Sequence, residues 1–214
     1  VTIDAMGTQK KIVKQIVEQK GDFALALKKN QGILYAKVQE AFDLAKKSGF
    51  VNIRHEKMKI EEKGHGRLEI RTYWIIDDEA VIGAVNRQGD WEQVRSIGMV
   101  ESERIIGDKT TNQVKYYILS IEGKVAVFSH AVRAHLGIEN TVHWILDVAF
   151  REDLSRIREG HSAHNYAILR HIALNLLKKE KTAKVGTHAK RLKAGWSTNY
   201  LEKVLLGAND TSLP

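Results

Sequence analysis

Two acidic residues far apart in the chain, Asp4 and Glu139, stand where a carboxylate could do chemistry. Asp4 directly follows VTI, three residues typical of a β-strand, and a helix-like stretch begins soon after it. Ligand sites of open α/β sheets form at the carboxyl ends of the strands, so Asp4 is a candidate ligand-binding residue. An aspartate after a strand also commonly serves as a turn or capping residue, and this second interpretation stays open.

Glu139 is a candidate because the helical pattern around it predicts a buried carboxylate. On a helix with about 100° per residue, the segment FSHAVRAHLGIENTVHWILDVAF places Glu139 at the centre of an apolar arc. The same arc contains His135, His143, Val132, Leu136, Val142 and Leu146. A carboxylate on a buried face is costly unless it is paired or bound to a metal ion. The pattern therefore predicts a cation near Glu139, either a metal ion or a neighbouring Arg or His.

Two carboxylates from distant parts of a basic α/β protein are typical of Mg²⁺-dependent attack on a phosphodiester. One ion activates the attacking oxygen and a second stabilises the leaving oxygen, a pair that normally needs three acidic ligands. Asp147 is the spare acid that we would nominate as a third ligand, which gives an unrelated metal nuclease as an alternative. His143 is more readily interpreted as a hydrogen-bond partner, and the HExxH motif of zinc proteases is absent.

The first fifty residues, which must position Asp4, are predicted to form a β–α–β–α unit. Val1 to Ile3 form a strand, and Thr8 is the predicted N-cap of a helix that Gly21 ends. FALAL at 23–27 is typical of a buried strand, KKNQG is a predicted loop, and residues 33–47 return to helix. Because so few strands cannot form a stable doubly covered sheet, we expect further strands upstream of Val1.

Two more parts complete the predicted α/β fold. Residues 51–123 alternate polar and apolar residues around turns, which predicts a mostly antiparallel β-rich insertion. Residues 124–214 follow a helical pattern, carry Glu139 and end in a basic tail. We therefore predict three parts, 1–50, 51–123 and 124–214.

The charge of the chain points to a polyanionic partner. The 214 residues carry a net charge of +8, and residues 160–206 hold nine Lys or Arg against two acids. Such a basic stretch most often binds nucleic acid, although a lysine-rich solvated surface has the same composition. No apolar run approaches a membrane span and no signal peptide is recognisable. The absence of cysteine excludes thiolate metal sites and suits a cytoplasmic protein.

Five motifs follow one another along the chain: VTIDAMGTQ, DFALALKKNQG, GHGRLEIRTYW, SIGMVESER, and HLGIENTVHWILDVAFREDLSRIREG with NYAILRHIALNLLK after it. Together they resemble the C-terminal part of a bacterial insertion-sequence transposase of the DDE class, in the family of H-repeat-associated proteins. The resemblance implies an RNase H-like core whose acidic triad binds two Mg²⁺ ions, for which Mn²⁺ can substitute. It implies cleavage at element ends and transfer of the 3′-hydroxyl to target DNA. It also implies a homo-oligomer acting on DNA, away from membranes, at the nucleoid in the bacterial cytoplasm.

By this resemblance, Asp4 corresponds to the second catalytic Asp and Glu139 to the catalytic Glu, with 134 residues between them. Relatives with a β-rich insertion between these two positions have a similarly long spacing. The first Asp is expected on a strand upstream of Val1, so the RNase H-like core is incomplete here and we expect no strand transfer by this chain alone. The alternative is a catalytically inactive DNA-binding or dimerising remnant, or an inhibitor of full-length transposase.

Eight polar residues are predicted DNA contacts. Three follow the strand beside Asp4, two share a face of the RLEIR strand, and three follow the helix of Glu139. They are Lys28, Asn30, Gln31, Arg67, Arg71, Arg151, Arg156 and Arg158. Contacts of this kind to phosphates depend strongly on salt and little on base sequence. Trp74, Trp91, Trp144 and Trp196 could stack on bases, although a tryptophan is more often a core or interface residue.

Overall fold

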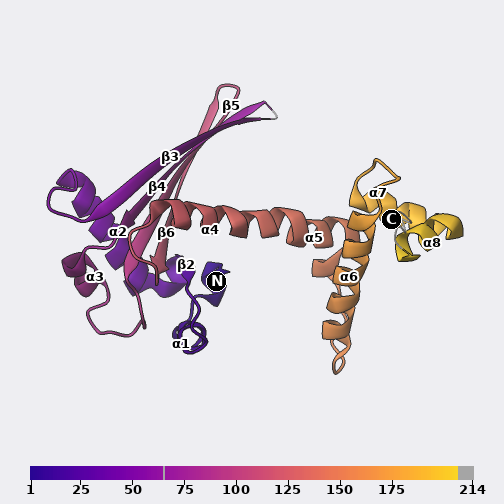
Figure 1. Cartoon of the computed structure of the whole chain (residues 1–214), viewed down its shortest axis with the longest axis horizontal. Helices are drawn as coiled ribbons and strands as arrows, with labels where there is room; N and C mark the ends of the chain where they lie inside the picture. The colour runs from indigo at the N-terminus through magenta and orange to yellow at the C-terminus, as the bar shows by residue number, and fades with distance from the viewer. Residues whose placement is uncertain (65, 207–214) are drawn as a thin grey trace, which may run out of the picture. The chain divides into compact units, whose positions relative to one another are not determined.

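The computed structural model describes residues 1–64 and 66–206, with the side chains of Glu139 and Asn140 excepted. The chain consists of two compact units, Val1–His135 and Leu136–Pro214. In Figure 1 the first unit runs from indigo to rose and the second from orange to yellow.

The first unit contains both helices and strands, and the second unit is helical. In chain order they are β1 (Thr2–Ile3), α1 (Lys10–Glu18), β2 (Ala24–Leu27), α2 (Gly32–Lys47), β3 (His55–Gly64), β4 (Arg67–Ile76), α3 (Glu79–Val85), β5 (Ser96–Ile106), β6 (Lys109–Leu119), α4 (Val125–Ile138), α5 (Trp144–Phe150), α6 (Ser162–Lys179), α7 (Thr187–Trp196) and α8 (Thr198–Leu206).

One mixed sheet with the strand order β1-β2-β6-β5-β4-β3 forms the centre of the first unit. β1 and β2 are parallel, whereas β2 pairs antiparallel with β6, and the remaining neighbours are all antiparallel. The strands of residues 51–123 therefore extend the same sheet that carries Asp4. The predicted α/β class is confirmed, and the strands within residues 51–123 pair antiparallel with one another.

Helix α2 covers one face of this sheet. Phe42 of α2 stacks on Tyr116 of β6 with ring centroids 6.0 Å apart, and Phe50, just beyond α2, stacks on Trp74 of β4 at 4.6 Å. The strand register places Trp74, Met99 and Tyr116 side by side on this face. These residues belong to the main buried cluster, so burial of apolar surface holds α2 against the sheet.

The N-terminal part of α4, up to His135, covers the opposite face. Phe128 contacts Tyr73 edge-on at 6.0 Å between ring centroids and Tyr117 at 5.2 Å. Gly98 of β5 lies beneath the Phe128 ring, and a Cβ at residue 98 would come within 2.6 Å of the ring atom Cζ. A glycine is therefore required for α4 to approach β5 this closely.

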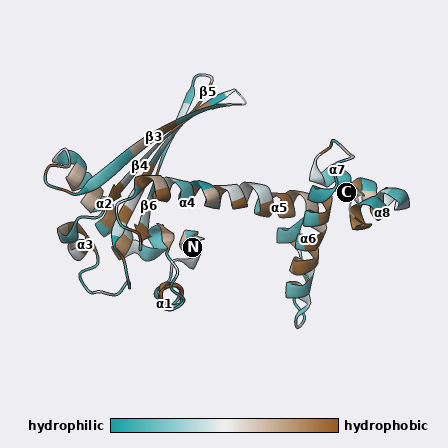
Figure 2. Cartoon of the chain, viewed as in Figure 1, coloured by the Kyte–Doolittle hydropathy of each residue, from teal (hydrophilic) through white to brown (hydrophobic). Residues whose placement is uncertain are grey.

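The hairpin ends of β3–β4 and β5–β6 project beyond the helices of the first unit (Figure 1). Figure 2 colours these ends largely hydrophilic. Alternating charges along them form cross-strand ion pairs, including Arg71 with Glu62 at 2.6 Å. The projecting part is thus stabilised by its own polar contacts and needs no apolar cover.

The helices of the second unit pack around a small apolar cluster of Leu177, Tyr200 and Val204. Beside it lies Glu180, which is 1% exposed and forms an ion pair with Lys190 at 3.4 Å between Nζ and Oε2. The Tyr200 hydroxyl donates to Glu180 Oε2 at 2.7 Å, and the Thr182 N–H donates to Oε1 at 2.6 Å. The Thr182 hydroxyl and these other donors outweigh the burial and lower the pKa of Glu180 to about 2.

Two local predictions are wrong. The N-cap of α1 is Gln9, because Thr8 is buried and its hydroxyl donates to the Ala26 carbonyl at 2.8 Å. The KKNQG segment contains a 3-10 turn, Lys29–Gln31, that leads directly into α2. The β-rich segment also contains α3, whose N-cap Asp78 accepts hydrogen bonds from two backbone N–H groups. Among residues 1–64 and 66–206, no helix is both long and apolar enough to cross a membrane.

Candidate functional site

Asp4 stands at the carboxyl end of β1, where the backbone enters a 3-10 turn, Ala5–Gly7. The Gly7 N–H donates to the Asp4 carbonyl at 2.9 Å. A Cβ at residue 7 would collide with Ile3 Cγ2. The turn can therefore fold back on β1 only with a glycine at residue 7. This geometry leaves the Asp4 side chain 50% exposed at the edge of the sheet.

Two amide side chains hold the backbone that follows Asp4. Asn30 Nδ2 donates to the Ala5 carbonyl at 2.9 Å, and Gln31 Nε2 donates to Ala5 at 3.1 Å and to Thr8 at 2.7 Å. They reach this loop because β1 and β2 are parallel, which brings their carboxyl ends to one edge of the sheet. Asn30 and Gln31 lie next to Asp4 as expected, but their N–H groups bind the protein itself.

The immediate surroundings of Asp4 are cationic. Lys28, the residue directly after β2, places its Nζ 3.2 Å from Asp4 Oδ2. Burial alone would raise the pKa of Asp4, but the Ala5 N–H, the Lys28 ammonium and the charge of Lys115 together outweigh it and lower that pKa. Asp4 is therefore ionised at neutral pH and can bind a cation.

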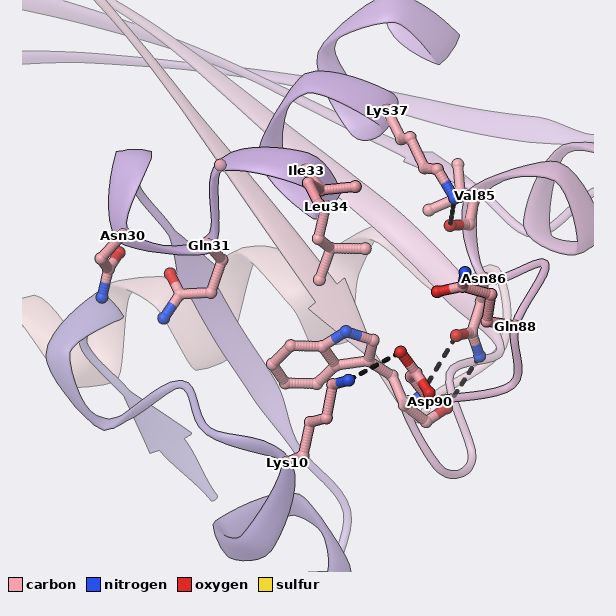
Figure 3. Close-up of a pocket in the computed structure, with 12 residues that line it drawn as sticks. Lys10, Asn30, Gln31, Ile33, Leu34, Lys37, Val85, Asn86, Gln88 and Asp90 are labelled. Carbon is pink, nitrogen blue, oxygen red and sulfur yellow. Dashed lines mark hydrogen bonds and ion pairs between the residues drawn. The ribbon is translucent and has the colours of Figure 1, made fainter.

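A pocket of about 280 Å³ adjoins the loop after Asp4 (Figure 3). Gln31 lines this pocket, and its buried Oε1 has no hydrogen-bond partner within the described ranges. Trp91 forms part of the wall, and Lys10 pairs with Asp90 at 2.6 Å between Nζ and Oδ2. Gln31 thus connects the pocket wall to the backbone that carries Asp4.

Glu139 begins a π-helical turn, Glu139–His143, between α4 and α5. The prediction of one continuous α-helix is wrong here, since a π-helical turn takes up an extra residue and rotates the residues that follow. The Thr141 hydroxyl donates to the Gly137 carbonyl at 2.7 Å, and Lys178 donates to the Thr141 carbonyl at 2.7 Å. π-Helical turns frequently mark functional positions. The Glu139 side chain itself lies outside the described part of the chain.

Asp147, the spare acid, lies on α5 among other acids. Burial and the neighbouring Asp153 raise the pKa of Asp147, and Arg170 pairs with Glu152 at 3.4 Å. No group of three or more His, Cys, Asp or Glu among the described side chains could hold a metal ion. Asp147 therefore has no complete ligand set around it in that part of the chain.

The predicted arginine contacts differ between the two units. In the first unit, Arg67 pairs with Glu69 at 2.8 Å, and Arg71 pairs with both Glu69 and Glu62. Their charges are compensated within the sheet. In the second unit the arginines are exposed, with Arg151 in a left-handed conformation at the end of α5. These exposed residues are Arg151, Arg156 and Arg158.

The tryptophans also divide between the two units. Trp74 and Trp91 pack into the core of the first unit, as expected of core residues. In the second unit, Trp144 is 60% exposed and Trp196 is 81% exposed. Sequence reasoning missed the Glu180–Lys190–Tyr200 contacts, because separations of 10 and 20 residues leave no local pattern.

Comparisons with known proteins give relatives of the chain. The family described as "Transposase DDE domain" matches residues 1–176. The protein named "H repeat-associated putative transposase YhhI" from Escherichia coli (strain K12) is 37% identical over 214 aligned positions, which cover 97% of this chain and 55% of that protein. "Putative transposase YncI" from Escherichia coli O157:H7 is 35% identical over 213 positions, covering 98% and 53%. The chain thus spans about half the length of these curated relatives. No solved structure matches it.

Proposed function

Because the chain belongs to the transposase DDE domain family, we propose that it acts in a metal-dependent DNA transposase whose Asp4 and Glu139 bind the catalytic ions. The reaction would be cleavage of phosphodiester bonds at the ends of an insertion element, followed by strand transfer. The observation that carries the proposal is the position and charge state of the Asp4 side chain. Its carboxylate is half exposed, ionised and held at the carboxyl end of a strand.

The topology supports an RNase H-like core with an insertion. The parallel strands β1 and β2 with α1 and α2 would belong to that core, and residues 51–123 would be the insertion between Asp4 and Glu139. The strands β3 to β6 fall between these two acids in the sequence and extend the sheet on the far side of β2.

A hard divalent cation suits Asp4, since Mg²⁺ prefers carboxylate oxygens and transposases of this family use divalent ions. Bound there, Mg²⁺ would stabilise the charge that develops on the phosphodiester oxygens. The Asp4 carboxylate would hold the ion, while Asn30 and Gln31 keep the following backbone in place. The exposed arginines of the second unit would contact DNA phosphates.

Metal-coupled DNA binding tests this function. Gel-shift titrations with terminal-repeat DNA, with and without Mn²⁺, would compare wild type with Asp4→Asn and Glu139→Gln. We expect Mn²⁺ to increase the DNA affinity of the wild type. In both variants we expect Mn²⁺ to leave the DNA affinity unchanged. Asp43→Asn, an exposed carboxylate of α2, is the matched control and should behave as wild type. Retention of the metal effect in Asp4→Asn would contradict the proposal.

A second candidate is a non-catalytic DNA-binding or dimerising protein that inhibits a full-length transposase. It is favoured by the exposed arginines Arg151, Arg156 and Arg158, which could bind DNA phosphates without any metal ion. Tight DNA binding that ignores both metal and the two substitutions would support this candidate.

A further inference from the structure

The Lys28 ammonium is paired with Oδ2 of Asp4, one of the two carboxylate oxygens that a metal ion could use. Its Nζ is 3.2 Å from Asp4 Oδ2, and the two side chains are 64% and 50% exposed. The register explains the contact: Ile3 pairs with Leu25, so the next residue along, Asp4, lies beside Ala26. Lys28 has extended backbone and follows two residues later, on the same face as Ala26.

We propose that the Lys28 ammonium stays paired with the Asp4 carboxylate until a divalent ion displaces it. The released ammonium then binds a DNA phosphate. The inference rests on the proposed function of Asp4 as a metal ligand. An exposed ion pair is weak, so a divalent ion can replace the ammonium at modest cost. The same cation nevertheless competes with the ion and repels it, which sets how tightly Asp4 binds metal.

The released ammonium needs an anion. With a divalent ion on Asp4, the charges of Lys28 and Lys115 are no longer compensated by that carboxylate. A DNA phosphate supplies the missing negative charge, and the flexible stem of lysine lets its ammonium move to reach it. Metal binding and phosphate binding are therefore coupled through one side chain.

Metal affinity gives the first test. Mn²⁺ titrations of the full chain, followed by electron paramagnetic resonance, would compare wild type, Asp4→Asn, Lys28→Met, Lys28→Arg and Lys29→Met. We expect Lys28→Met to bind Mn²⁺ about two- to five-fold more tightly, since it loses the competing cation. Lys28→Arg should stay close to wild type because it keeps the charge. Lys29→Met, an exposed neighbour in the same turn, should not change the affinity.

The outcomes separate this inference from the proposed function. If Asp4→Asn binds Mn²⁺ as well as wild type, Asp4 is not a metal ligand and both ideas fail. If Asp4→Asn loses affinity while Lys28→Met is unchanged or weaker, the metal role of Asp4 stands and the competition by Lys28 is refuted.

The salt dependence of DNA binding gives the second test. Fluorescence anisotropy with labelled duplex DNA would measure the slope of log Kd against log salt concentration. With Mn²⁺, Lys28→Met should reduce the magnitude of this slope by about 0.9, the value for one lost phosphate contact, and without Mn²⁺ it should leave the slope unchanged. Equal reductions in both conditions would show an ordinary phosphate contact and would overturn the coupling.

Discussion

Replacing Glu180 by Gln should destabilise the second unit strongly and remove part of its pH dependence. Glu180 is buried, accepts hydrogen bonds from Thr182 and Tyr200, and pairs with Lys190. Glutamine keeps the size of the side chain but removes the charge. It also leaves the buried Lys190 ammonium without its counter-ion, which adds to the cost.

The pKa of Glu180 sets the magnitude. It falls from an ordinary 4.5 to about 2, and each pKa unit corresponds to about 1.4 kcal/mol, so the ionised carboxylate contributes about 3 kcal/mol at neutral pH. Because the folded-state pKa is lowered, this stabilisation is fully present above about pH 5 and is lost as the pH falls toward 2. At pH 3 only about 1 kcal/mol should remain.

Hydrogen exchange measured by mass spectrometry on peptides from α6, α7 and α8 would test this. Corrected for intrinsic rates, exchange in Glu180→Gln should exceed wild type by about 100-fold or more at pH 7, with the charge-dependent part falling to about 10-fold at pH 3. Glu202→Gln, an exposed carboxylate of α8, is the control and should match wild type. A difference between Glu180→Gln and wild type that stays constant from pH 7 to pH 3 would refute the reasoning.

Further substitutions test other contacts. Gly98→Ala should cost about 1–3 kcal/mol in urea unfolding, since its Cβ would collide with Phe128, and an unchanged midpoint would contradict that packing. Gln31→Leu should cost about 1–3 kcal/mol by leaving the Thr8 carbonyl without its side-chain donor, whereas the Ala5 carbonyl keeps Asn30, and the same unfolding measurement checks it. Arg156→Ala should reduce the salt slope of DNA binding by about 0.9, whereas Arg71→Ala should leave that slope unchanged because its charge is already paired.

The sheet was largely predictable, because alternation and apolar runs reflect burial directly. The strand at FALAL and the hairpin around the GDK turn appear where the pattern predicts them. Thr8 shows the limit of such local signals: its residue type favours an N-cap, but a tertiary contact with Ala26 takes its hydroxyl. The spacing around Glu139 fits a continuous α-helix, and nothing in that spacing signals the π-helical turn.

The candidate site was predictable only in part. Asp4 and Lys28 could be placed together, because both follow predicted strands whose parallel pairing brings their ends to one edge. The roles of Asn30 and Gln31 could not be predicted. A side-chain amide that contacts DNA and one that hydrogen-bonds a loop of the protein look the same in the sequence. The charge compensation of Arg71 depends on register, which pairs β4 with β3 residue by residue.

Residues 1–50 and residues 51–123 contribute strands to one sheet, and this limits how the chain can evolve. A segment that folds alone can be exchanged between relatives as a cassette, but residues 51–123 cannot be exchanged in this way. Excising them would leave β2 with a bare edge, expose the core between the sheet and α2, and take Lys115 away from Asp4. Recombination between relatives should therefore preserve this segment together with the first fifty residues, so that the two are inherited as one unit.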